Sequence, residues 1–264
     1  RRLRNTLRYL LGALNEFDEK EKVDFAEMPE LEKWVLHRVS ELSKKIEENT
    51  EKFNLHDIYL DIHNFCTIDL SAFYFDIRKD TLYCEELNGV DRRSCRTVMD
   101  ILFQSLTTWL APIICFTAEE AWQSRYNDKE NSVHLQTYYK ADKSWENSLI
   151  GKKWTEIREL RSVVTTAIEE KRKEGLLGSS LQAKVIIEAD ENILNKLSDI
   201  NLPDVFICSE VETNINSKID ETNFSVQIEL ASGGKCQRCW KIVKEVKDEI
   251  ELCNRCNGVL KKNK

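Results

Sequence analysis

Hydrophobic residues recur at helical spacing through the first half of the chain, with polar residues filling the positions between them. A spacing of three to four residues places apolar side chains on one face of an α-helix. Four segments show it, within residues 3–14, 29–46, 53–77 and 91–110. The expected buried positions include Leu3, Leu7, Leu10, Leu11, Leu14, Trp34, Val35, Leu42, Met99, Leu102, Phe103 and Trp109. Because short connections favour antiparallel neighbours, residues 1–125 are predicted to form one helical bundle.

A fifth, short helix is expected to begin at Thr117 and to run through Trp122. The segment Thr117-Ala-Glu-Glu120 has the order of a capping box, in which a hydroxyl and a later Glu satisfy backbone N–H groups at a helix start. Glu119 and Glu120 are therefore interpreted as stabilising the helix start. They are not interpreted as a catalytic pair, since adjacent helical side chains point about 100° apart.

The pattern changes in the second half of the chain. Residues 152–174 still have helical periodicity, and Gly175 follows as a helix stop. Three β-rich runs come next, at Ala183–Glu188, Asp204–Cys208 and Phe224–Leu230, with a helical stretch at residues 191–197. This order predicts a small α/β domain. Ser232-Gly233-Gly234 is interpreted as a flexible joint to the last segment.

Two Cys-x2-Cys pairs near the end of the chain carry the clearest chemical signal. Cys236-Gln-Arg-Cys239 and Cys253-Asn-Arg-Cys256 are separated by thirteen residues, 240–252, which are expected to form a hairpin. This spacing lets two tight turns bring four thiolates to one tetrahedral metal ion. Zinc suits four sulfur ligands and keeps no open position for chemistry. The alternative, two disulfides, is disfavoured because the total of nine cysteines is odd. We expect one structural Zn²⁺ held by Cys236, Cys239, Cys253 and Cys256.

The predicted fold class is mainly α. A helical bundle is expected in residues 1–150, a helix plus a small α/β domain in residues 151–231, and a four-cysteine zinc module in residues 232–264. No apolar run approaches the length of a membrane span.

Basic and aromatic residues surround the predicted metal site. Arg238 and Arg255 lie inside the two turns, Trp240 directly follows the first turn, and Lys241 comes next. Side chains placed in this way by a metal favour a nucleic-acid contact surface, although a Trp beside such a turn often only packs on it. The chain carries a net charge of -7, yet residues 235–264 hold nine Lys/Arg against four Asp/Glu, and residues 1–15 hold four Arg and no acid. Nucleic-acid binding would therefore depend on these two basic ends.

The other cysteines and the histidines are given structural interpretations. Buried thiols are expected at Cys66, Cys84, Cys95, Cys115 and Cys208, which lie in apolar sequence. Surface or boundary positions are expected for His37, His56, His63 and His134, because their spacing fits neither a metal site nor a catalytic triad. No catalytic residue is predicted in this chain.

The segment Leu110-Ala-Pro-Ile-Ile-Cys-Phe-Thr-Ala-Glu-Glu-Ala-Trp122 resembles a signature of the anticodon-binding helical domain of class Ia aminoacyl-tRNA synthetases. Further stretches are similar to segments of the bacterial-type isoleucyl-tRNA synthetases, which end in a four-cysteine zinc module. They are Arg1-Arg-Leu-Arg-Asn-Thr-Leu-Arg-Tyr-Leu-Leu-Gly-Ala-Leu-Asn-Glu-Phe17, Asp76-Ile-Arg-Lys-Asp-Thr-Leu-Tyr-Cys84 and Leu177-Gly-Ser-Ser-Leu181. Cys115 departs from the resemblance, since many relatives have proline there. The resemblance covers essentially the whole chain.

The resemblance implies that this chain binds tRNA(Ile), with its bundle and C-terminal modules reading the anticodon. ATP and Mg²⁺ would bind only in a catalytic domain whose HIGH-like and KMSKS-like motifs do not occur here, and an inserted editing domain is absent too. Because the chain begins at Arg1 inside a helical pattern, we expect a fragment of a longer protein. The resemblance implies that this protein is a monomeric, cytoplasmic ligase.

The chemistry of the residues suggests which of them would contact RNA in this role. Trp240, Arg238 and Arg255 are the candidates for the anticodon loop, because unstacked bases can lie on aromatic rings and guanidinium planes, and Lys241 is a further RNA-binding candidate. Phosphate and sugar contacts are expected from Arg1, Arg4, Asn5 and Arg8, unless these residues pair with acids of a neighbouring domain.

Two alternatives stay open. One is the corresponding region of a valine, leucine or methionine enzyme, of which the terminal cysteine module speaks against valine. The other is a free-standing zinc-ribbon scaffold that binds protein partners through the acidic bundle.

Overall fold

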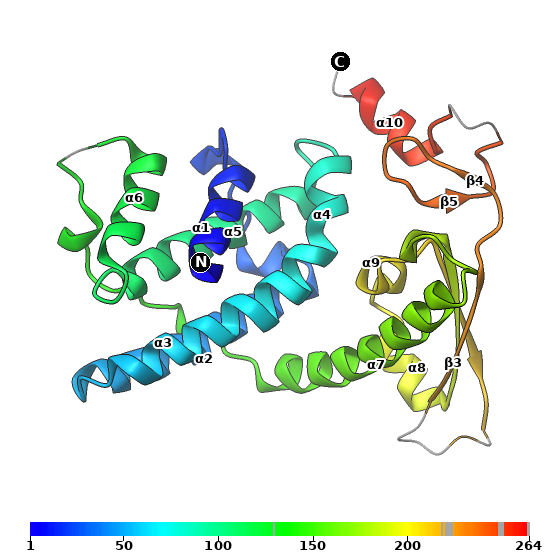
Figure 1. Ribbon diagram of the computed structural model, residues 1–264, viewed down its shortest axis with the longest axis horizontal. Helices are drawn as coiled ribbons and strands as arrows, with labels where there is room; N and C mark the ends of the chain where they lie inside the picture. Colours follow the sequence, from blue (N-terminus) through cyan, green and yellow to red (C-terminus); the bar gives the residue numbers. More distant parts are fainter. Residues whose placement is uncertain (129, 218, 220–223, 248–250, 263–264) are drawn as a thin grey trace. The chain divides into compact units, whose positions relative to one another are not determined.

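The chain forms two compact units, whose elements are traced in Figure 1. Of the 264 residues, the computed structural model describes 1–128, 130–217, 219, 224–247 and 251–262. The first unit contains Arg1–Leu82 and Leu87–Gly151, and the second contains Tyr83–Glu86 and Lys152–Lys264. The fold class is mainly α, as predicted, and within the described residues the strands and the cysteine cluster belong to the second unit.

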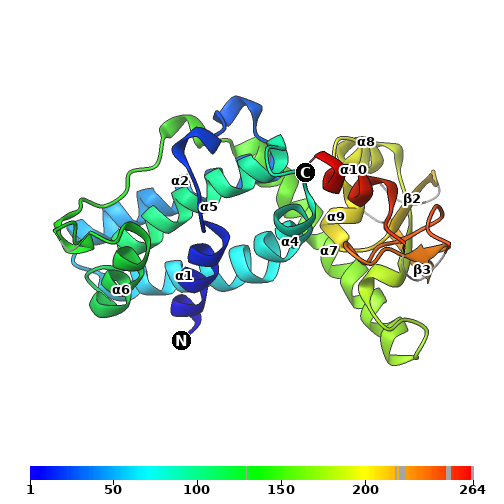
Figure 2. The ribbon, with the colours of Figure 1, turned by 90° about the horizontal axis from the view of Figure 1, so that it is seen from above.

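Helix α5 is the centre of the first unit. The α-helices here are α1 (Arg2–Ala13), α2 (Glu30–Glu51), α3 (Leu55–Asn64), α4 (Phe75–Cys84), α5 (Val90–Leu110) and α6 (Cys115–Tyr126). Short turns of 3-10 helix lie between α1 and α2, namely η1 (Glu19–Glu21) and η2 (Phe25–Glu27), and after α6, namely η4 (Val133–Leu135) and η5 (Lys143–Trp145). α5 contacts α1, α2 and α6, most of its residues are buried, and Figure 2 shows it between α1 and α2.

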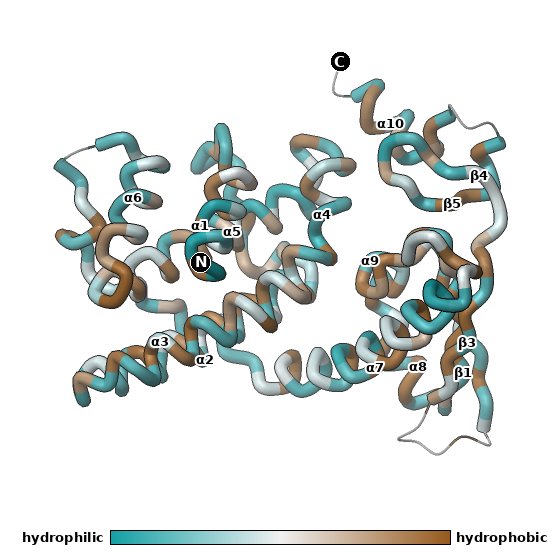
Figure 3. The backbone as a smooth tube through the Cα atoms, viewed as in Figure 1, coloured by the Kyte–Doolittle hydropathy of each residue, from teal (hydrophilic) through white to brown (hydrophobic). Residues whose placement is uncertain are grey.

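The apolar faces predicted from the sequence form the core of this unit. Trp34, Trp109 and Phe103 are almost fully buried, and Trp34 packs edge-on against Phe73, with ring centroids 5.2 Å apart. Leu11 is only partly buried, at the edge of the leucine stripe of α1. Hydrophobic and hydrophilic residues are interspersed along each helix in Figure 3, as expected for helices with one buried face.

A buried ion pair joins α2 to α4. The carboxylate of Glu32, fully buried, accepts hydrogen bonds from Arg78 Nε at 2.7 Å and from the Tyr74 hydroxyl at 3.1 Å, and a second bond from Arg78 Nη2. Burial raises the pKa of the Tyr74 hydroxyl well above its usual value, so that it remains a donor. Loss of one partner would leave the other charge buried without compensation.

The third predicted helix differs in its start and its winding. It begins at Leu55 rather than Phe53, whose side chain is 88 % exposed and whose backbone has a φ of 52°. Its middle, η3 (Phe65–Tyr74), is a π-helix between α3 and α4. Ser71 Oγ donates to the carbonyl of Cys66, five residues earlier, at 2.7 Å. The wider winding of a π-helix is not visible in a pattern built on 3.6 residues per turn.

The predicted capping box is wrong. α6 begins at Cys115, so Thr117 lies inside the helix rather than at its start. Glu119 instead accepts hydrogen bonds from the Ser132 hydroxyl and the Val133 N–H, each at 2.9 Å, and Glu120 pairs with Arg4. Both glutamates thus bind groups distant in sequence.

Two further expectations are wrong. His37 is buried, and its Nδ1 accepts a hydrogen bond from the N–H of Asn147 at 3.1 Å; burial lowers its pKa. Cys115 is exposed, because it starts α6 instead of lying within an apolar helix face.

The second unit is built on a small mixed sheet beside α7 (Ser148–Lys173), whose first residues still belong to the first unit. After η6 (Ser180–Gln182) follow β1 (Ala183–Ala189), α8 (Glu191–Leu197), α9 (Leu202–Phe206), β2 (Glu210–Ile215) and β3 (Phe224–Leu230). The strand order is β2-β1-β3. β1 is parallel to β2, with Lys184 opposite Glu210, and antiparallel to β3, with Ala183 opposite Leu230. Every second residue of β1 is buried, and Gly175 adopts a φ of 79° after α7, as its role of helix stop requires.

The strand predicted at Asp204–Cys208 is wrong. Most of this segment lies in α9, which has Pro203 in its first turn, and Ile207 ends it with a φ of 53°. Val205 and Phe206 are buried. The β-rich composition therefore reflects burial of a short helix, and the sheet takes its strand from the more polar β2.

The last described elements are β4 (Gly234–Lys235), β5 (Ile242–Val243) and α10 (Asn254–Lys262). The hairpin formed by β4 and β5 thus contains the first cysteine pair in its loop, whereas the hairpin was predicted between the two pairs. Residues 248–250 of the predicted hairpin lie outside the described residues. Among the described residues, none of the helices combines the length and apolar character of a membrane span.

Candidate metal centre and nucleic-acid interface

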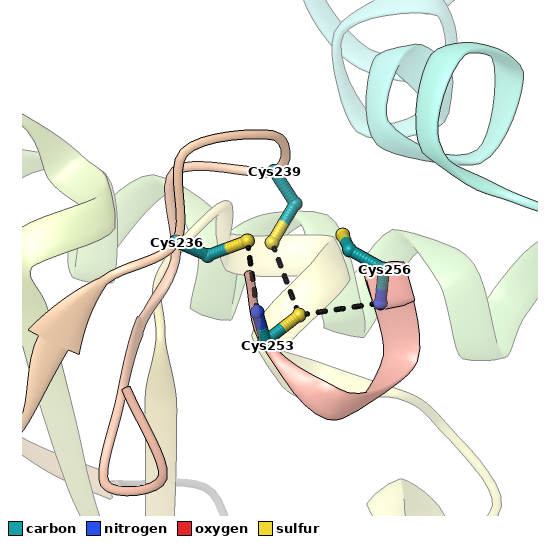
Figure 4. A group of neighbouring side chains, drawn as sticks. All are labelled: Cys236, Cys239, Cys253 and Cys256. Atoms are coloured by element: carbon teal, nitrogen blue, oxygen red, sulfur yellow. Dashed lines mark hydrogen bonds between the residues drawn. The ribbon is translucent and has the colours of Figure 1, made fainter. Parts of the chain in front are cut away.

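The four predicted ligands converge on one point. The sulfurs of Cys236, Cys239, Cys253 and Cys256 all lie within 4.8 Å of one another, and all four residues are buried (Figure 4). Cys239 Sγ and Cys253 Sγ are 3.8 Å apart. A tetrahedral centre with bonds of about 2.3 Å places its sulfurs about 3.8 Å apart. All nine cysteines are free thiols, so the arrangement is that of a metal site and not of a disulfide pair.

Backbone hydrogen bonds fold the two cysteine turns. The N–H of Trp240 donates to the carbonyl of Cys236, and the N–H of Cys236 donates to that of Lys241, both at 3.0 Å. The second pair lies at the start of α10, where the Cys256 N–H points to Cys253 Sγ at 3.4 Å. The Cys253 N–H points to Cys236 Sγ at 3.3 Å. N–H groups directed at sulfur favour the thiolate form that a metal binds.

The ionisation of Cys236 agrees with this geometry. Burial disfavours its thiolate, but N–H groups of Cys253, Cys239 and Arg238 outweigh burial and lower its pKa to about 6. The donor set of four buried sulfurs, with N–H groups facing those of Cys236 and Cys253, fits a structural metal ion with no open coordination position.

The predicted joint Ser232-Gly233-Gly234 is closely packed rather than open. A Cβ atom on Gly234 would lie 2.4 Å from the carbonyl oxygen of Val246, and Gly233 has a φ of 125°. The two glycines are therefore needed for close backbone approach at the edge of the cysteine turns.

Arg238 is bound to the backbone carbonyls of the last two residues of α4, which belong to the second unit together with Arg238. Its Nη1 donates to Cys84 O at 2.8 Å and its Nη2 to Tyr83 O at 3.2 Å, while the thiol of Cys84 points to Arg238 O at 3.7 Å. The Cys84 side chain is buried with the four cysteines and Val246. The guanidinium thus caps carbonyls at the C-terminus of a helix, where positive charge is favourable.

Three further cations of the cysteine region have acidic partners. Arg255 Nη1 lies 3.5 Å from Glu85, Lys262 Nζ lies 2.6 Å from Glu86, and Lys241 Nζ lies 2.6 Å from Asp204. The sequence did not indicate that Tyr83–Glu86 contacts the cysteine region, because the two segments lie more than 150 residues apart.

Trp240 is the predicted residue most available to a partner. Its side chain is 59 % exposed, and its φ is 65°, in the left-handed region that bulky residues rarely adopt. Lys235 Nζ lies over the indole, 5.7 Å from its centroid.

The N-terminal candidates Arg1, Arg4, Asn5 and Arg8 are all exposed in or beside α1. Arg4 makes two hydrogen bonds to the carboxylate of Glu120, at 2.5 and 2.6 Å. This acid belongs to the same unit, so the pair differs from the alternative expectation of acids in a neighbouring domain. A groove of about 310 Å³ between α1 and α6 is lined by Arg4, Arg8, Thr117, Glu120 and Ser124, among others.

Residues 32–187 match the family described as the anticodon-binding domain of tRNA ligase. The isoleucine–tRNA ligase of Gluconobacter oxydans is 43% identical over 263 residues, which cover 98% of this chain and 27% of that protein. The isoleucine–tRNA ligases of Zymomonas mobilis and Natranaerobius thermophilus are 41% and 36% identical, again over 98% of this chain and over 28% and 30% of their own lengths. The chain thus spans little more than a quarter of the relatives that it matches.

Proposed function

Because the chain belongs to the family of anticodon-binding domains of tRNA ligases, we propose that it is the tRNA-binding portion of an isoleucine–tRNA ligase. The supporting observation is the similarity to isoleucine–tRNA ligases over 98% of the chain, through both units. The partner is tRNA(Ile), and the full-length protein attaches isoleucine to it with ATP as a monomer in the cytoplasm. The chain itself contributes binding and no catalytic residue.

The metal in this proposal is one structural Zn²⁺ held by Cys236, Cys239, Cys253 and Cys256. Four sulfurs within 4.8 Å support a closed tetrahedral site. Its role is to hold the turn that presents Trp240, since so short a segment has too small a core to hold this conformation alone.

Trp240 is the proposed contact to the anticodon loop. Bases of a single-stranded loop are unstacked and can pair their faces with an aromatic ring. Arg238 and Arg255 support this contact indirectly, because their partners Cys84 and Glu85 fix the turns in which they lie. Lys241 does the same through Asp204.

The exposed residues of α1 are proposed to contact phosphates. Arg1, Asn5 and Arg8 face solvent, and Arg4 would have to exchange the carboxylate of Glu120 for a phosphate. An exposed ion pair is weak enough for such an exchange. These contacts position the RNA without reading its sequence.

Binding of RNA by the 264-residue chain tests this proposal. We expect a transcript of tRNA(Ile) to bind more tightly than an unrelated RNA of the same length. Because the chain has a net charge of -7, the affinity should be modest and should fall steeply with salt. Equal affinity for the two RNAs would refute tRNA recognition and leave the scaffold alternative, for which capture of a protein partner would be the readout.

A further inference from the structure

We propose that Lys235 and Trp240 together form the contact site for one unpaired RNA nucleotide, with the indole stacked on the base and the Lys235 ammonium bound to the adjoining phosphate. This inference rests on the proposed function and adds Lys235 to it as a binding residue.

The two side chains are fixed relative to each other by the first cysteine turn. Lys235 ends β4 and pairs with Ile242 of β5, while Trp240 closes the turn through its N–H bond to Cys236 O at 3.0 Å. Lys235 directly precedes Cys236, and Trp240 directly follows Cys239. The Lys235 ammonium consequently lies over the indole, 5.7 Å from the centroid, within the range of a cation–π contact.

Packing does not explain a tryptophan at this position. With a φ of 65°, glycine would fit the turn with less strain, and the side chain is 59 % exposed. A large ring held in solvent by a disfavoured backbone is the kind of outlier that marks a functional site.

The charge near the ring is available to a ligand. Lys235 is exposed, and among the described residues no carboxylate lies within ion-pair distance of it, whereas Lys241 is paired with Asp204. The indole is 59 % exposed with the Lys235 ammonium beside it, which leaves ring surface on which one base can stack. The bases of a duplex are covered by their neighbours, so the site selects single-stranded RNA.

The experiment measures binding of tRNA(Ile) transcript to the full chain over a series of salt concentrations. Lys235→Gln should weaken binding about 1.5- to fivefold, as for loss of one exposed ion pair, here between the ammonium and a phosphate. It should also lower the slope of log affinity against log salt by about 0.7–0.9, as for loss of one phosphate contact. Lys235→Arg keeps the charge and should bind as the wild type does. Lys261→Gln is the matched control, since it removes the same charge from exposed α10 of the same region.

A double-mutant cycle tests whether the two residues act as one site. Lys235→Gln should cost less in a Trp240→Ala background than in the wild type, because residues that share a ligand are not additive. The assignment is overturned if Lys235→Gln changes neither affinity nor slope, if Lys261→Gln lowers both equally, or if the two substitutions are additive. A wild-type chain that does not prefer tRNA(Ile) to unrelated RNA would instead overturn the proposed function, and the site with it.

Discussion

Removal of the metal should unfold the cysteine region and leave the helical bundle of the first unit folded. Outside the cysteines, the apolar core of the described residues between 234 and 262 rests mainly on two buried valines, Val246 and Val259. Full burial of two such side chains contributes about 3–6 kcal/mol. A structural zinc ion supplies about 10–16 kcal/mol of apparent binding energy. The metal is thus the larger stabilising contribution, whereas the first unit has its own core around α5.

Cysteine reactivity provides the assay, because burial separates the nine thiols into distinct groups. In the loaded protein only Cys115 is exposed, so a soluble thiol reagent should modify about one cysteine per chain. After treatment with a strong chelator, the four ligands lose their protection. Cys84 loses it as well, since it is buried against them and its carbonyl is held by Arg238. The count should rise to about six.

The thiols of the first unit provide the internal control. Burial raises the pKa of both Cys66 and Cys95 to about 12, so they should stay unreactive in the chelated protein. In a Cys115→Ser background the count should start near zero, and adding Cys84→Ala should lower the chelated count by about one. Protection of Cys84 after chelation would show that the cysteine region stays folded without metal, and reaction of Cys66 and Cys95 as soon as the metal leaves would show that the first unit unfolds with it.

Substitutions of Trp240, Glu32 and His37 test separate parts of the structure. Trp240→Ala should weaken tRNA(Ile) binding by about 1–3 kcal/mol with zinc content unchanged, whereas Trp240→Phe should keep much of the affinity. If Trp240→Ala lost the metal together with RNA binding, Trp240 would instead be a packing residue. Glu32→Gln should lower the free energy of unfolding by about 3–5 kcal/mol in denaturant titrations, because Arg78 loses its buried counter-charge; Glu120→Gln, at an exposed pair, should change it little. Because the folded-state pKa of His37 is lowered by burial, its contribution to stability is present above its usual value of 6.5 and is lost as pH falls below it. His37→Gln should remove that part of the pH dependence of unfolding, and an unchanged profile would exclude His37 as its source.

The periodicity of the sequence predicted the helices that bury one face and expose the other. The leucines of α1 and the aromatic residues of α5 lie on the expected faces, and the helix expected at residues 191–197 is α8. The cysteine spacing likewise predicted a cluster, because two tight turns are local structures that need only the residues within them.

Features that depend on distant partners were not predictable in this way. Arg238 sits in a basic sequence, yet its partner carbonyls belong to Tyr83 and Cys84. Val205 and Phe206 have high strand propensity, yet burial in a short helix overrides it. Glu119 has the spacing of a capping residue relative to Thr117, but α6 begins two residues before Thr117. The Glu119 carboxylate therefore accepts a hydrogen bond from Ser132 instead. Propensity and spacing describe neighbours along the chain, whereas these outcomes are decided by tertiary contacts.

Recognition of the anticodon of tRNA(Ile), which we propose for this chain, can be measured in a single comparison of affinities. The dissociation constants of the metal-loaded chain are measured at one salt concentration for tRNA(Ile) and for the same tRNA with its three anticodon bases replaced. Since the phosphate contacts are identical in the two RNAs, any difference reports contacts to the bases. We expect weaker binding of the tRNA with the replaced anticodon, and a smaller difference between the two RNAs for Trp240→Ala. Equal dissociation constants for the two RNAs would show that the chain does not recognise the anticodon bases.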